Sequence, residues 1–129
     1  MIDETKAREL LIDSCYSSAE ATHCISQELS SAKFIDVLVH IAVDADDYQG
    51  DAPGAAAYFL SQAEPVLVEP YEDRLLVLLE SADGYAGSVA VILGRMKSAR
   101  AKAVIEHGVT EGWWPEHLYK QALSFYETT

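Results

Sequence analysis

The sequence predicts an all-α protein: a single domain, residues 1–129, of about four antiparallel helix pairs stacked as a short α-solenoid. Apolar residues recur every three or four positions nearly throughout, which is typical of amphipathic helices. Similar helical segments recur at intervals of 35 and 33 residues, which indicates stacked repeats. The chain has 129 residues, of which 50% are hydrophobic, and this suits one domain with its own core. An irregular helical bundle is the alternative.

The first third of the chain is predicted to form three helices. They are expected at residues 3–15, 17–29 and 31–43. Asp3 should cap the first, and Ser17 or Ser18 should begin the second, because short polar side chains accept hydrogen bonds from free amides at a helix start. The third is rich in β-branched residues, for which a strand is the alternative. Its length and the spacing of its apolar positions favour a helix.

The middle of the chain is predicted to form a loop and then three more helices. Residues 44–54 are rich in Asp, Gly and Pro, which mark turns. Asp51 is expected to cap the next helix, with Pro53 in its first turn and Pro65 at its end. The three helices are expected at residues 52–64, 71–82 and 85–97.

The last quarter of the chain is predicted to form two helices joined by a loop between glycines. Ser98 should cap a short helix that extends to about residue 107. Gly108 and Gly112 bracket the loop, and Pro115 should open the last helix, at residues 115–127. This final pair completes the expected four.

A repeat is visible in three segments that align without gaps, at residues 19–27, 54–62 and 87–95. Each begins with small residues, continues with larger apolar ones, and follows another amphipathic helix. One helix pair cannot bury its apolar face alone, so neighbouring pairs are expected to stack and form a continuous core. Small residues such as Gly87 and Ala90 are expected to let the inner helices approach closely.

A more specific pattern lies at residues 84–105. A helix of small and aliphatic residues ends in Leu-Gly-Arg at 93–95, and Ser-Ala-Arg-Ala at 98–101 follows a short turn. This pattern resembles a HEAT repeat, in which an inner helix ends in a similar triplet before the next outer helix begins. The resemblance implies a HEAT-like superhelix with a concave binding surface and, usually, no catalysis of its own.

The chain is strongly acidic, and its charge is unevenly distributed. The formal net charge is -12, from 21 acidic and 9 basic residues. Residues 36–83 contain 11 acidic residues and one basic residue, whereas residues 95–102 carry four basic residues. The balance argues against nucleic acid and anionic membranes, which both attract basic surfaces. It favours a protein partner with a basic surface, and a face that merely keeps the protein soluble is the alternative.

No metal, cofactor or catalytic site is predicted. The acidic loop from Asp44 lacks the Gly and Glu of a calcium-binding loop, where Gln49 and Ala55 stand instead. The histidines lack the i, i+4 spacing of a helical zinc site.

Cys15 and Cys24 are expected to be buried free thiols, as suits a reducing compartment. The sequence has no apolar signal region and no apolar run of membrane-spanning length, so a cytoplasmic location is expected.

Trp113 and Trp114 stand at the entry to the last helix, before Pro115. One is expected to staple that helix to the core. The other is expected to be exposed and to act as an interface anchor. A hydrophobic lid formed by both tryptophans is the alternative.

These properties favour a protein-binding module that neutralises a partner by occlusion. Small acidic HEAT-like proteins of bacteria resemble the immunity proteins that cover the active sites of cognate toxins, which are often basic when they act on nucleic acid. The resemblance implies an immunity protein, and a scaffold or regulatory adaptor is the alternative, ahead of a self-associating structural protein or an enzyme. The expected partner-binding residues are Asp44, Asp46, Asp47, Tyr48, Asp51, Glu72, Asp73, Trp113 and Trp114.

Overall fold

The computed structural model describes residues 2–44, 51–81 and 85–127, and every regular element in these residues is a helix. The α-helices are α1 (Glu4–Cys15), α2 (Ala19–Glu28), α3 (Ala32–Ala42), α4 (Asp51–Leu60), α5 (Pro65–Val68), α6 (Glu72–Ser81), α7 (Ala86–Arg95), α8 (Ala99–Glu111) and α9 (Glu116–Ser124). Two short 3-10 helices are η2 (Glu69–Tyr71) and η3 (Phe125–Glu127). The all-α prediction is therefore confirmed for the part of the chain that the structure describes.

Several helices begin at a side-chain cap. Asp3, Ser18, Ser31 and Ser98 each accept a hydrogen bond from the backbone amide three residues later, at the starts of α1, α2, α3 and α8. These caps satisfy amides that have no partner within the helix. The predicted caps Asp3, Ser18 and Ser98 are confirmed.

Two predicted boundaries are wrong, because proline and glycine act at other points of the helices. α4 ends at Leu60, and Pro65 opens the short α5 instead of ending α4. Proline is tolerated in a first helical turn, where its missing amide would have had no partner. The loop predicted between Gly108 and Gly112 belongs to α8, which ends at Gly112 with a left-handed φ of 69°.

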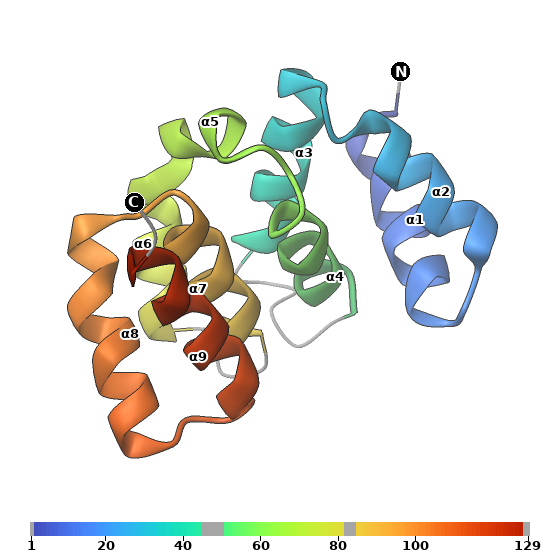
Figure 1. The fold of residues 1–129 in the computed structure, drawn as a ribbon. Helices are drawn as coiled ribbons and strands as arrows, with labels where there is room; N and C mark the ends of the chain where they lie inside the picture. Colours follow the sequence, from blue (N-terminus) through green and yellow to red (C-terminus); the bar gives the residue numbers. More distant parts are fainter. Residues whose placement is uncertain (1, 45–50, 82–84, 128–129) are drawn as a thin grey trace.

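The helices form antiparallel pairs that lie side by side in chain order (Figure 1). The pairs are α1 with α2, α3 with α4, α6 with α7, and α8 with α9. Neighbouring pairs join through α1 and α4, then α4 and α7, then α7 and α9. This arrangement is consistent with the predicted stack of four pairs and also with the alternative of an irregular bundle, and the HEAT resemblance stays a prediction.

The first pair is turned relative to the others. In the later pairs the second helix of each (α4, α7, α9) joins the neighbouring pair, whereas in the first pair α1 packs against α4. α2 lies outside α1 and buries two side chains, those of Ala21 and Ile25. Residues 19–27 are therefore not equivalent to the other two aligned segments, because α1 offers the larger apolar face to the core.

α7 packs against α4, α6, α8 and α9, and nearly all of its side chains are buried. Two of its glycines lie against α9. A methyl group at Gly87 would lie 2.9 Å from the Leu118 side chain, and one at Gly94 would lie 2.5 Å from the carbonyl oxygen of Ala122. The absence of these methyl groups lets α9 approach closely, as expected for Gly87.

Polar contacts hold α7 against the second helix pair at both ends. The Arg95 guanidinium donates hydrogen bonds to the carbonyl oxygens of Ser61 and Ala63, just beyond α4. At the start of α7, the buried Tyr85 hydroxyl donates to the carbonyl oxygen of Ala42, 3.0 Å away. α7 therefore begins beside the end of α3 and ends beside the end of α4.

Candidate functional site

Two predicted binding residues, Asp44 and Asp51, lie beside the first helix pair. The Asp44 carboxylate forms an ion pair with Arg8 of α1, at 2.8 Å. Asp51 accepts a hydrogen bond of 3.1 Å from the Tyr16 hydroxyl, and this bond raises the pKa of Tyr16. Three further predicted residues lie outside the described part of the chain: Asp46, Asp47 and Tyr48.

Glu72 and Asp73 lie at the start of α6, where they contact the start of α8. Arg100 donates hydrogen bonds to Glu72 at 3.1 Å and to Asp73 at 2.5 Å. The Ser98 hydroxyl also donates to Glu72. The hydrogen bonds from Ser98 and Arg100 lower the pKa of the Glu72 carboxyl. Glu72 thus links two helices, whereas the Asp73 side chain remains largely exposed.

The predicted acidic residues do not share one surface. Asp44 and Asp51 lie where α3 ends and α4 begins. The contact of Tyr85 with the end of α3 places them at the end of the molecule where α7 begins. Glu72 lies at the opposite end, where α8 begins. Antiparallel pairing separates the two groups, although both belong to one acidic stretch of sequence.

The predicted basic segment at residues 95–102 is likewise divided by internal contacts. Arg95 binds the backbone beyond α4, and Arg100 binds the start of α6. The Lys102 ammonium lies 5.9 Å from the centre of the Tyr126 ring. These three cations therefore join neighbouring elements of the fold.

An acidic surface that bears a tyrosine joins the second and third helix pairs, and of its residues Asp73 was among the predicted binding residues. The Tyr71 hydroxyl donates a hydrogen bond of 3.0 Å to Asp36 of α3. Partial burial of the hydroxyl and this hydrogen bond raise the pKa of Tyr71. Glu69 and Asp73 are exposed and lie two residues on either side of Tyr71 in the chain, and Glu69 borders Arg100 at the start of α8. We call Asp36, Glu69, Tyr71 and Asp73 the Tyr71 surface.

A sequence signal for the Tyr71 surface existed in the repeat. Asp36 is one of the polar residues of α3, and Tyr71 follows it by 35 residues, one repeat later. In a stack, residues one repeat apart lie close together. The pairing was therefore predictable in principle, once the period and the outer face of α3 were both known.

The two tryptophans have different environments. The Trp113 indole packs edge-to-face against His107 and Tyr119, with ring centres 5.3 and 5.6 Å away. Gly108 leaves room for this ring, because a methyl group there would lie 2.7 Å from it. Trp114 is 84% exposed, compared with 36% for Trp113. Trp113 therefore anchors the segment and Trp114 faces solvent, so a lid formed by both tryptophans does not fit.

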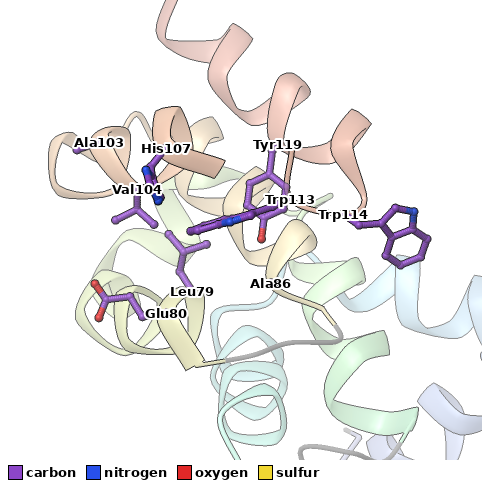
Figure 2. Close-up of a pocket in the computed structure, with 9 residues that line it drawn as sticks. All are labelled: Leu79, Glu80, Ala86, Ala103, Val104, His107, Trp113, Trp114 and Tyr119. Carbon is purple, nitrogen blue, oxygen red and sulfur yellow. The ribbon is translucent and has the colours of Figure 1, made fainter. Parts of the chain in front are cut away.

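A hollow of about 670 Å³ lies beside Trp113. α6 contributes Leu79 and Glu80 to its lining. α8 contributes Val104 and His107 from the other side. In Figure 2 the Trp113 indole occupies the middle of the group, with Glu80 at one edge, whereas Trp114 points away from the other lining residues.

The cysteines are free, as predicted, but they are not buried. Cys15 is exposed and Cys24 is half-buried. Partial burial of the Cys15 thiol and the nearby charge of Asp51 raise its pKa. A raised pKa keeps a thiol protonated at neutral pH and lowers its reactivity as a nucleophile.

Among the described residues, polar and charged side chains lie mainly on the surface, and Ser98 is the one classed as buried. Among them, no three His, Cys, Asp or Glu side chains are grouped so as to hold a metal ion. No helix in the described ranges combines the length and apolar composition needed to cross a bilayer. Every buried side-chain nitrogen or oxygen in these ranges has a hydrogen-bond partner.

Comparison of the chain with models of known protein families, with curated proteins and with solved structures found no match. The functional proposal therefore rests on the charges and contacts of the surfaces themselves. Two places are considered below: the Tyr71 surface, with its carboxylates, and the hollow beside Trp113.

Proposed function

We propose that this protein covers a basic surface of another protein and so blocks its action, as an immunity protein blocks its cognate toxin. The observation that carries this proposal is the Tyr71 surface. Its carboxylates come from two adjacent helix pairs, and the hydrogen bond from Tyr71 to Asp36 links these two pairs. Free cysteines agree with a cytoplasmic location for this encounter.

The cross-link within the Tyr71 surface supports a binding role. A hydrogen bond of 3.0 Å between the Tyr71 hydroxyl and the Asp36 carboxylate links η2 to α3, and this contact restrains both side chains. A surface that is already ordered loses less conformational entropy when a partner binds. Tyrosine is also enriched in protein interfaces, where its ring supplies apolar area and its hydroxyl a hydrogen bond.

Charge complementarity supports a basic partner. The chain carries a net charge of -12, and such a field accelerates the encounter with a positively charged protein. Asp46 and Asp47 add to this charge in the sequence between α3 and α4. Trp114 offers an exposed aromatic anchor for the same kind of partner.

The deciding experiment uses the gene next to the one that encodes this chain. Its product is expressed alone and together with this protein, and cell growth and complex formation are measured. We expect growth to stop when the product is expressed alone and to recover on co-expression, with both chains in one complex. A harmless product that forms no complex contradicts the immunity role.

Charge reversal tests the electrostatic part of the proposal. Glu69→Lys should slow association by about tenfold at low salt, with a smaller effect at high salt. Glu20→Lys is the control for Glu69→Lys, because it makes the same charge change on the exposed side of α2. An equal effect of Glu20→Lys would show that net charge acts without the Tyr71 surface.

A further inference from the structure

α6 and α8 are tied together at their starts and separate toward their ends. At the starts, Ser98 donates a hydrogen bond to Glu72, and Arg100 donates one to Asp73. Farther along, the hollow of about 670 Å³ lies between Glu80 of α6 and the second half of α8. The two helices therefore leave an open site at one end of the molecule.

The hollow combines an apolar and aromatic lining with one carboxylate. Leu79 and Val104 provide apolar walls, and Trp113 lies between them and Tyr119 (Figure 2). Glu80 stands at the edge and forms no ion pair with any described residue. Its charge is therefore available to a ligand.

Trp114 extends this site beyond the hollow. Its indole points away from the other lining residues (Figure 2), and it makes no ring contact with another residue in the described ranges. An indole that is 84% exposed offers a face to a cation or to an apolar side chain. A ligand that reaches both Glu80 and Trp114 must be a segment of several residues, because these two residues stand at opposite edges of the group in Figure 2.

The chemistry of the site fits a segment that carries both apolar and basic side chains. A bulky apolar side chain would pack on Leu79 and Val104, as ligands do in pockets with apolar walls. An arginine suits Glu80 and the tryptophans, because a planar guanidinium pairs with a carboxylate and stacks on aromatic faces. The net charge of -12 favours such a segment over an acidic one.

We propose that the hollow between α6 and α8 is the docking site for a basic amphipathic segment of a protein partner. An arginine of that segment pairs with Glu80, an apolar side chain fills the hollow against Trp113, and Trp114 covers the outer end of the segment. This inference rests on the proposed protein-binding function and locates a contact separate from the Tyr71 surface.

Tryptophan emission of the full chain reports on this docking. The probe is a helical peptide of leucine and arginine, of about 18 residues or five helical turns, and its counterpart has glutamate in place of arginine. We expect the arginine peptide alone to shift the emission to shorter wavelength in a saturable way. Glu80→Gln and Trp114→Ala should each weaken binding by about fivefold, whereas the matched charge control Glu20→Gln should change it by less than about twofold.

Three outcomes would overturn the proposal. An equal loss with Glu20→Gln would mean that the peptide responds to net charge alone. An unchanged emission would mean that no segment enters the hollow. Light scattering that shows a dimer of the chain, disrupted by Trp114→Ala, would mean that a second copy occupies the site. Since the peptide test does not use the neighbouring gene product, it can succeed where the immunity test fails, and the reverse also holds.

Discussion

Gly94 of α7 lies directly against the backbone of Ala122 in α9. A methyl group at Gly94 would stand 2.5 Å from the carbonyl oxygen and 3.0 Å from the Cα atom of Ala122. Backbone atoms cannot rotate away as the end of a side chain can, so this contact leaves no room for any larger residue. The packing of the third and fourth helix pairs therefore depends on the absence of one side chain.

We predict that Gly94→Ala destabilises the protein by about 2 kcal/mol or more, because overpacking at a helix interface exceeds the gain in helix propensity. Gly54→Ala is the matched control. Its new methyl group would lie 3.8 Å from Tyr85, which is an ordinary contact. We expect this control to be neutral or more stable by about 0.5 kcal/mol. Urea denaturation of both variants measures the difference, and equal stabilities would disprove the close approach.

Arg95 is predicted to stabilise the junction of α4 and α7. Its guanidinium donates to the carbonyl oxygens of Ser61 and Ala63, the latter at 2.7 Å. Arg95→Ala leaves these acceptors without their charged donor, and we expect a loss of about 1.5–3 kcal/mol. Arg74→Ala removes an exposed arginine of α6 and should change stability by less than about 0.5 kcal/mol. Similar losses for both variants would contradict the role given to Arg95.

Glu72 is predicted to make stability depend on pH in the acidic range. Hydrogen bonds from Ser98 and Arg100 lower its pKa below the ordinary value of 4.5. The folded state thus favours the ionised carboxyl, and its contribution is present above pH 4.5 and is lost as the pH falls through the lowered pKa. Thermal unfolding of Glu72→Gln should show a lower Tm than the parent protein at neutral pH.

The difference in Tm between Glu72→Gln and the parent protein should shrink steadily as the pH falls below 4.5. Glu64→Gln serves as the control at neutral pH, since Glu64 is exposed and makes no side-chain cap hydrogen bond at α5. A gap between Glu72→Gln and the parent that stays constant down to strongly acidic pH would show that the carboxyl is not linked to stability in this way.

The two tryptophans are predicted to differ in both emission and stability. Trp113→Ala removes a ring that packs on His107 and Tyr119, and we expect a loss of about 2 kcal/mol, less than for a fully buried tryptophan. Trp114→Ala should change stability by less than about 0.5 kcal/mol. In Trp113→Phe the remaining indole should emit as in water and be readily quenched by acrylamide. Weak quenching there would contradict the exposure of Trp114.

The positions of most helices in the sequence were predictable, because helix caps and the spacing of apolar residues act within a few residues. Ser18 and Ser98 begin helices since their hydroxyl groups accept the free amides that follow. Pro65 and Gly108 were misjudged, because proline can open a helix as well as stop one and glycine can lie inside a helix. Gly108 is needed there to admit the Trp113 ring, a packing requirement that the rules for helix caps and apolar spacing do not contain.

The candidate site was predicted less well, because acidic residues that are close together in the sequence need not lie on the same surface of the folded protein. Glu72 and Asp51 belong to the same acidic stretch and lie at opposite ends of the molecule. Tyr71 and Asp36 stand 35 residues apart and share a hydrogen bond. One tryptophan of the Trp113-Trp114 pair was expected to be exposed, and the structure shows that Trp114 is the more exposed of the two.

The sequence by itself left a regular stack and an irregular bundle as alternatives, but it determined that the chain forms short amphipathic helices and where most of them begin. Those properties follow from side-chain spacing and caps, which act within a few residues. Tertiary structure alone decided that α1 rather than α2 joins the second pair. It also decided which charged side chains form ion pairs or hydrogen bonds within the protein. These outcomes depend on which apolar faces fit together, and that fit is a property of residues distant in the chain.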